Sequence, residues 1–155
     1  MYTGARIKEL AMLKKADLDF AQEVLHIRGT RTDAANRLVP MHPVLVPLLS
    51  ALDPKSKDEY VIERLAIDAR GERGKAIGKR FGRLKTSMGY TGRDKVFHSI
   101  RKTVATLLEQ AEVLEGVAAD ILGHEKQTMT YGLYSGGSSP QQKREAVHRL
   151  RYPIS

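Results

Sequence analysis

Most apolar positions of this chain recur at intervals of three and four residues, which is the spacing of one face of an α-helix. The clearest case is the segment 96–111, "VFHSIRKTVATLLEQA", whose apolar stripe consists of Phe97, Ile100, Val104, Leu107, Leu108 and Ala111. The same spacing predicts helices within 6–15 and 42–52. It also predicts a helix over 77–88, with an apolar side formed by Ile77, Phe81, Leu84 and Met88.

Two further helices have ends that can be read from the sequence. The segment 113–122, "VLEGVAADIL", runs into Gly123, and glycine commonly ends a helix in the left-handed conformation. The segment 138–150, "SSPQQKREAVHRL", offers Ser139 as N-cap, Pro140 at the first helical position and Gln142 three residues after the cap.

Strand character is confined to residues 18–41. The β-forming residues of "LDFAQEVLHIRG" are followed by the polar turn "GTRTDAAN" and then by "NRLVPM", which predicts a short antiparallel hairpin. The expected fold class is therefore α+β, mostly α-helical with a small antiparallel sheet.

The length bounds the number of domains. With 155 residues, of which 41% are hydrophobic, the chain can form one domain with a sizeable core but hardly two, so we expect a single domain over 1–155. The first predicted helix begins almost at once after "MYTGA". We therefore expect that the front of a larger protein is missing.

The charge is strongly positive and local. Lys and Arg number 26 against 18 Asp and Glu, a net charge of +8, and seven of these eight charges lie within 70–95. On the predicted helix of that segment, Lys79, Arg80 and Arg83 occupy the face opposite the apolar one. Such a surface attracts polyanions and suggests nucleic acid as partner, and the alternative is an ordinary solvated helix face. The expected DNA-binding residues are Arg73, Lys75, Lys79, Arg80 and Arg83.

Several functional classes are disfavoured. The chain has no cysteine, which excludes disulfides and thiolate chemistry. Its most apolar run, 38–52, is interrupted by three prolines and a histidine, and no signal-peptide layout is present, so we expect a cytoplasmic protein. Neither a carboxylate cluster suited to magnesium nor a Gly-rich phosphate loop occurs, so we expect no metal and no cofactor.

Three groups of residues could carry chemistry. His98 and Arg101 are three residues apart on one helix face, with Arg101 at the border of the apolar stripe. A half-buried arginine needs an anion, which could be an internal carboxylate or a ligand. Arg6 and Glu9 have the spacing of an ordinary surface ion pair.

The third group is the segment 122–137, "LGHEKQTMTYGLYSGG", which contains His124, Tyr131 and Tyr134. A tyrosine hydroxyl has a pKa near 10, so as a nucleophile it needs a proton acceptor and a stabilised electrophile. A phosphodiester held by two guanidinium groups would meet that need without a metal ion.

These residues resemble a known family. The segments "TGARIKEL", "FHSIRKTVATLL", "ILGHE" and "TYGLYSGG" occur in this order, and with "NRLVPMHPVL" they are similar to the catalytic domain of the tyrosine recombinases, phage and prophage integrases in particular. The resemblance covers nearly the whole chain. It implies the DNA breaking-rejoining fold, here without the amino-terminal core-binding domain and the first catalytic-domain helices.

The resemblance also implies the site. Arg6, His98, Arg101 and His124 match the family's catalytic residues, Glu9 matches a supporting acidic residue, and Tyr134 matches the nucleophile, with Tyr131 as the alternative. Tyr134 would attack a DNA phosphate and form a 3′-phosphotyrosyl link. The implied function is site-specific DNA recombination and integration.

One position departs from the family pattern. The hairpin turn normally carries a lysine that protonates the leaving oxygen, whereas here Arg31 stands at that position and no lysine occurs between Lys15 and Lys55. Arginine releases a proton reluctantly. The main alternative is therefore a catalytically inactive DNA-binding or assembly remnant of a prophage integrase. A further alternative, which shares the recombinase chemistry, is relaxation of DNA without a specific site in the manner of type IB topoisomerases.

Partners follow from the same resemblance. Strand exchange joins two duplexes, so the full-length protein is expected to act as a homotetramer on double-stranded DNA, associated with the bacterial nucleoid. This chain alone is expected to be monomeric in solution, without membrane contact.

Overall fold

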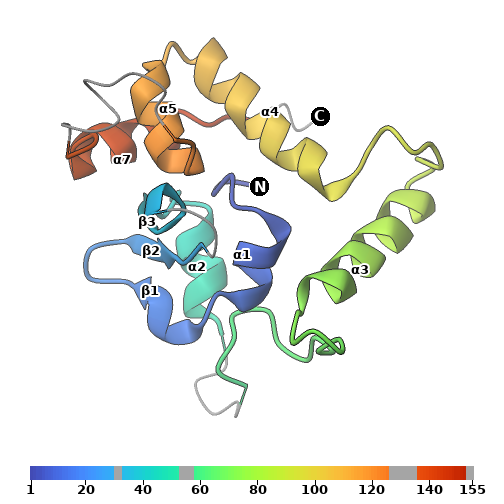
Figure 1. Cartoon of the computed structure of the whole chain (residues 1–155). Coiled ribbons are helices and arrows are strands. Elements are labelled where there is room, and N and C mark those ends of the chain that lie inside the picture. Colours follow the sequence, from blue (N-terminus) through green and yellow to red (C-terminus); the bar gives the residue numbers. More distant parts are fainter. Residues whose placement is uncertain (30–32, 53–57, 126–135, 153–155) are drawn as a thin grey trace.

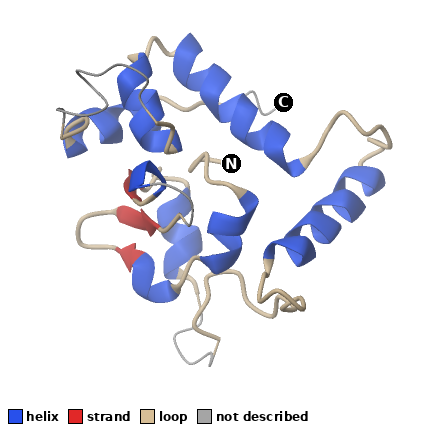
Figure 2. Ribbon diagram, in the orientation of Figure 1, coloured by secondary structure: helices blue, strands red, loops and turns tan. Residues whose placement is uncertain are grey.

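The computed structural model describes residues 1–29, 33–52, 58–125 and 136–152. Helices are the predominant regular elements of this part of the chain, and a single small sheet accompanies them (Figure 2). In chain order the elements are α1 (Ile7–Met12), the 3-10 turn η1 (Lys15–Asp17), β1 (Leu18–Asp19), β2 (Val24–Ile27), the 3-10 turn η2 (Asp33–Ala35), β3 (Arg37–Pro40), α2 (Leu45–Ser50), α3 (Gly74–Ser87), α4 (Phe97–Gln110), α5 (Glu115–Leu122) and α7 (Pro140–His148).

The predicted hairpin is confirmed as part of a three-stranded antiparallel sheet with the order β1-β2-β3. Leu25 on β2 pairs with Val39 on β3, and both side chains are buried. Leu38, the residue before Val39 on β3, is 39% exposed, so an exposed side chain precedes a buried one along this strand. Because strand side chains alternate between the two faces, Arg37 lies on the same face as Val39.

The main core lies between the sheet and three helices. Val39 is packed with Val104 of α4, Ile121 of α5 and Val147 of α7, and each of these side chains is fully or almost fully buried. Figure 1 shows α5 and α7 on one side of the sheet, with α4 running past the start of α1. This arrangement brings the amino-terminal segment, α4 and the end of α5 together, which is where the candidate site forms.

Both helix ends that the sequence predicted are confirmed. Gly123 ends α5 in the left-handed conformation with φ of 69°. Ser139 caps α7: its hydroxyl oxygen accepts a hydrogen bond from the backbone N–H of Gln142 at 3.2 Å, and the Gln142 side chain accepts one from the N–H of Ser139 at 2.9 Å. None of the helices in the described ranges combines the length and the apolar character required to cross a membrane.

The prediction of an apolar side for 77–88, which covers most of α3, is only half correct. Ile77 is buried near α1, and Phe81 contacts Phe97 edge to face with ring centroids 5.5 Å apart. Leu84 and Met88, however, are 57% and 63% exposed. The physical reason is that α3 contacts α1 through its first turns and then runs away from the core (Figure 1).

Candidate active site

The amino-terminal turn of α1 holds the first arginine. The carboxylate of Glu9 accepts a hydrogen bond from the backbone N–H of Arg6 at 2.8 Å and another from Arg6 Nη1, also at 2.8 Å. Arg6 Nη2 donates to the carbonyl oxygen of Gly123 at 3.2 Å. The Glu9 side chain is 6% exposed and that of Arg6 is 43% exposed. The pair is therefore not an ordinary surface contact, because its acid is buried and its guanidinium opens to solvent.

Arg101 is buried in the same region. It lies on α4, is 5% exposed, and its Nη1 donates to the carbonyl oxygen of Gly4 at 2.7 Å. Its Nη2 is buried without a hydrogen-bond partner among the described residues, which also provide no ion pair for it. The anion that a buried arginine needs could therefore be supplied by a ligand.

The conformation of Gly4 permits this contact. Its φ is +59°, a value that side chains other than that of glycine rarely adopt, and a Cβ there would lie 2.5 Å from Leu122 Cδ2. The backbone can therefore approach α4 and α5 closely enough for its carbonyl oxygen to reach the guanidinium of Arg101.

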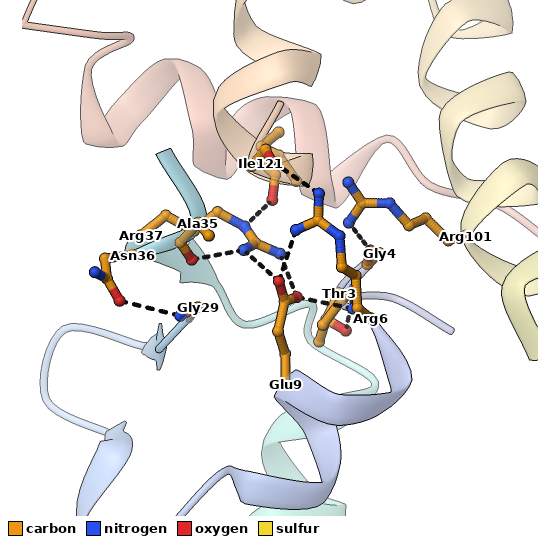
Figure 3. Close-up of polar contacts among 12 residues, drawn as sticks. Thr3, Gly4, Arg6, Glu9, Gly29, Ala35, Asn36, Arg37, Arg101 and Ile121 are labelled. Carbon is orange, nitrogen blue, oxygen red and sulfur yellow. Dashed lines mark hydrogen bonds and ion pairs between the residues drawn. The ribbon is translucent and has the colours of Figure 1, made fainter. Parts of the chain in front are cut away.

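Positive charge is concentrated at this point. Burial, together with the charges of Arg6 and Arg37, lowers the pKa of Arg101 to about 10. Figure 3 shows the three guanidinium groups around Glu9 and the end of α5. A group of cations with a single carboxylate stabilises a bound anion, because each guanidinium repels the others until an anion is present.

His124 joins the group because α5 ends directly before it. Its backbone N–H donates to the carbonyl oxygen of Ala119 at 3.0 Å, which fixes the chain as it leaves the helix. Partial burial lowers the pKa of His124, and the charge of Arg101 is the next cause. Arg6, Arg37 and His98 act in the same direction, so His98 also lies within electrostatic reach of the site.

One residue of this group, Arg37, is not among the site residues predicted from the sequence. Its side chain is 5% exposed and forms an ion pair with Glu9, whose Oε2 lies 3.0 Å from Arg37 Nη2. The signal was present in "NRLVPM": alternation in a strand places Arg37 on the same face as the buried Val39, and a buried arginine requires a partner.

A cavity of about 540 Å³ adjoins the group. Its wall contains Arg37 and His124, together with Arg28 from the hairpin and Lys143 from α7. The lining also includes one carboxylate, that of Asp120, so three cationic side chains outnumber it and the hollow suits polar, anionic groups better than an apolar ligand.

Three predicted site residues lie outside the described residues. These are Arg31 in the hairpin turn and the two candidate nucleophiles, Tyr131 and Tyr134. The structure brings together the other members of the set, Arg6, Glu9, Arg101 and His124, with His98 close by.

The expected DNA-binding residues divide into two groups. Arg73 is 5% exposed, its guanidinium lies 3.6 Å from the ring centroid of Tyr60, and its Nη2 donates to the Ile62 carbonyl oxygen. The prediction that Arg73 belongs to an exposed DNA-binding face is therefore wrong, because the side chain anchors the loop before α3. Lys75 is exposed but paired with Asp68 at 2.8 Å.

The remaining three basic residues, Lys79, Arg80 and Arg83, are exposed on α3. Arg80 donates to the carbonyl oxygen of Arg64 at 3.3 Å. Lys79 and Arg83 lie one helical turn apart and border a shallow hollow on the helix surface. A basic, exposed helix face is thus present, although it is smaller than the sequence suggested.

The end of α5 provides a stability prediction. Gly123→Ala is expected to lower the free energy of unfolding by more than the roughly 1–2 kcal/mol that a left-handed residue costs, because its Cβ would lie 2.7 Å from Arg37 Nη1. Gly89→Ala is the matched control, since Gly89 has φ of +84° and open space around it. Urea denaturation of both variants measures the difference, and equal losses would contradict a tight contact between Arg37 and Gly123.

Comparison with known proteins assigns the class. The sequence model of the phage integrase family matches residues 1–138, so the chain belongs to the phage integrase family. This confirms the resemblance to tyrosine recombinases. Prophage integrase IntF of Escherichia coli is 26% identical over 129 residues, which cover 83% of this chain and 27% of that protein. Tyrosine recombinase XerC of Chlamydia trachomatis is 31% identical over 128 residues, covering 79% and 39% respectively.

Solved structures agree with the fold. The integrase of mycobacterium phage Brujita superposes with a TM-score of 0.70 at 20% identity, covering 99% of this chain and 50% of that one. The XerA recombinase superposes with a TM-score of 0.63 at 25% identity, covering 97% and 54%. The expected α+β recombinase fold is confirmed, and the chain spans less than half of the length of the two curated relatives above.

Proposed function

We propose that this chain is the part of a tyrosine recombinase that cuts and rejoins DNA at a specific site through a phosphotyrosyl intermediate. The observation that carries the proposal is the buried Nη2 of Arg101, which has no partner among the described residues and lies in one group with Arg6 and His124. A scissile phosphate would supply the missing acceptor and would neutralise the excess positive charge.

The chemistry follows from the positions of the cations. Arg6 and Arg101 would bind the non-bridging oxygens of the phosphate and stabilise the additional negative charge of the five-coordinate transition state. His124 would donate a hydrogen bond to the same phosphate. A lowered pKa favours the neutral imidazole of His124, which still carries one N–H donor.

The nucleophile is assigned to Tyr134. Its hydroxyl oxygen would form a bond to phosphorus while the bond to the 5′-oxygen breaks, and His98 would accept the phenolic proton. The departing 5′-oxygen takes up a proton, for which Arg31 is the candidate donor at the usual lysine position. The reverse attack by the 5′-hydroxyl of a partner strand rejoins the DNA, so one phosphodiester replaces another.

DNA outside the reacting phosphate would contact α3. Lys79, Arg80 and Arg83 are the exposed cations of this helix, and together with Lys75 they would bind backbone phosphates. In the full-length protein we propose a homotetramer on two duplexes at the nucleoid, whereas the present chain would be monomeric without DNA.

A nicked suicide substrate tests the proposal. With an integrase attachment site in such a substrate, the parent chain and Tyr131→Phe should form a covalent adduct with DNA that survives denaturing electrophoresis. Tyr134→Phe should form none, because no other phenol replaces the attacking oxygen.

The outcomes separate the alternatives. Adduct formation by Tyr134→Phe but not by Tyr131→Phe would move the nucleophile to Tyr131. Binding of the site by the parent chain without any adduct would contradict the enzymatic proposal and would instead support an inactive DNA-binding remnant. Loss of supercoils without a specific site would indicate topoisomerase-like relaxation.

A further inference from the structure

We propose that Arg37 is a positioning residue of the strand-transfer site: its guanidinium fixes Arg6 and the backbone that carries His124 in one arrangement around the phosphate. The inference rests on the proposed function, since the arrangement matters for the transfer reaction. It adds to the site a residue that lies outside the motifs by which the catalytic residues were found.

Arg37 uses nearly all of its hydrogen-bonding capacity inside the protein. Nε donates to the carbonyl oxygen of Ile121 at 2.7 Å, and Nη1 donates to that of Ala35 at 2.9 Å. Nη1 and Nη2 also reach the two carboxylate oxygens of Glu9, at 3.4 and 3.0 Å. These contacts occupy four of the five N–H donors of a guanidinium. Arg37 is thus unlike Arg101, whose Nη2 lacks a partner in the described part of the chain, and it has little left to offer a phosphate.

Arg6 makes the matching contacts from the other side. It binds the same carboxylate, that of Glu9, and the carbonyl oxygen of Gly123 at the same helix end. Arg6, Glu9, Arg37 and the last residues of α5 therefore form a closed ring of contacts (Figure 3). Removing Arg37 would open this ring on two sides at once, at Glu9 and at Ile121.

The ring explains how the end of α5 is held. The last carbonyl groups of a helix have no partner within the helix and carry negative partial charge, so guanidinium donors stabilise them. Arg37 and Arg6 donate to Ile121 and Gly123 respectively, and His124 follows immediately. The position of the His124 backbone is therefore set by the same two side chains that flank Glu9.

Arg37 also connects the hairpin to the site. It begins β3, and the neighbouring Asn36 accepts a hydrogen bond from the backbone N–H of Gly29 across the turn at 3.0 Å. Gly29 is thus tied to the residue directly before Arg37, which contacts Glu9. A planar fork is needed for this bridging, and the single ammonium group of a lysine cannot contact Glu9 and Ile121 with the same geometry.

The pKa of His124 provides a second measurement of the effect of Arg37. Among the described residues, the charges that lower the pKa of His124 include those of Arg101 and His98 from α4, Arg6 from the segment before α1 and Arg37 from β3. The charged side chains of Arg28, Asp120 and Lys143 line the same cavity as His124. Loss of the Arg37 charge should raise the pKa of His124, whereas a substitution that keeps the charge should leave it nearly unchanged.

The experiment compares Arg37→Met and Arg37→Lys with the parent chain. Adduct formation at saturating suicide substrate should slow by about 10²-fold in both variants, because misplacement of catalytic groups by about 1 Å has an effect of that size. The equilibrium affinity for DNA should stay near that of the parent. Histidine resonances followed by NMR across the pH range should show a raised pKa of His124 in Arg37→Met only.

Arg144→Met is the matched control. Arg144 is exposed on α7, and among the described residues its guanidinium donates to the carbonyl oxygen of Gln22 at 2.7 Å rather than to Glu9 or Ile121. Its adduct rate should remain within about threefold of the parent. If Arg37→Met does not fold, the double variant Arg37→Met with Glu9→Gln removes the buried carboxylate together with its partner. Arg37→Lys provides the rate measurement independently of the double variant.

The outcomes distinguish this inference from the proposed function. Adduct formation by Arg37→Lys and Arg37→Met at the parent rate would overturn the role of Arg37 and leave the recombinase proposal standing. Absence of adduct in the parent would overturn the recombinase proposal itself. In that case the NMR comparison tests whether Arg37 acts on His124. Unchanged His124 resonances in Arg37→Met would overturn the positioning role, and a raised pKa of His124 in this variant would support it.

Discussion

Arg101→Met is expected to slow formation of the covalent DNA adduct by about 10²–10³-fold, the effect of removing one donor that stabilises transition-state charge. In the parent the Arg101 guanidinium is desolvated, and its Nη2 has no partner among the described residues, so under the proposed function it would face the negative charge that develops on the phosphate. Methionine has a similar length but offers no donor and no charge. The measurement is the single-turnover rate of adduct formation on a nicked suicide substrate.

The same substitution is expected to have little effect on stability. Arg101 is 5% exposed, and its burial and the charges of Arg6 and Arg37 disfavour its charged form, which lowers its pKa to about 10. Replacing an incompletely paired buried charge by an apolar side chain is often neutral or stabilising, so the free energy of unfolding should stay within about 1 kcal/mol of the parent or increase. Among the described residues, the hydrogen bond of the Arg101 guanidinium that is lost is the one to the carbonyl oxygen of Gly4.

Lys102→Met is the control, because it removes one positive charge from the adjacent, exposed position of α4. It should change neither the adduct rate nor the free energy of unfolding appreciably. A large loss of stability in Arg101→Met together with an unchanged adduct rate would mean that Arg101 serves the fold and not the phosphate.

The fold was predictable wherever a segment carried its own signal. The helix over 96–111 and the capped ends at Gly123 and Ser139 depend on spacing and on local backbone chemistry, and all three are confirmed. The C-terminal half of α3 was misassigned because periodicity reports an apolar face but not whether another element reaches it. Leu84 and Met88 have the right spacing and remain exposed.

The candidate site divides in a similar way. Arg6, Glu9, Arg101 and His124 could be selected because they belong to short motifs, and the structure brings them together. Arg37 was missed because its importance arises from contacts with residues far along the chain, such as Ile121.

Arg73 was misassigned for the same reason. Nothing in its neighbourhood along the sequence shows that it stacks on Tyr60. Local sequence can indicate that an arginine is present on a helix or in a loop, but only tertiary contacts decide whether its guanidinium meets a partner inside the protein or faces a ligand.

Glu9→Gln is expected to lower the free energy of unfolding by about 3–5 kcal/mol at pH 7, the usual effect of breaking a buried ion pair from one side. The Glu9 carboxylate is the acceptor for the guanidinium groups of both Arg6 and Arg37 and for the backbone N–H of Arg6. An amide of the same shape provides one acceptor oxygen and no charge. Two guanidinium groups, one of them buried, would then lie side by side without their counterion.

The pH dependence of this loss identifies its electrostatic origin. Burial alone raises the pKa of Glu9, but hydrogen bonds from Arg37 and from the backbone of Arg6 outweigh it, and the net pKa is lowered from 4.5. A carboxyl group with a lowered pKa in the folded state contributes its full stability above the unfolded-state pKa and loses it as the pH falls through the folded-state value. The difference in free energy of unfolding between the parent and Glu9→Gln should therefore be constant near neutral pH and should shrink below pH 4.5.

Urea denaturation at a series of pH values measures this difference. Glu109→Gln on the exposed side of α4 is the control, for which a difference within about 0.5 kcal/mol is expected. A difference between parent and Glu9→Gln that stayed constant into strongly acidic solution would assign the effect to packing and would contradict the charge network around Glu9.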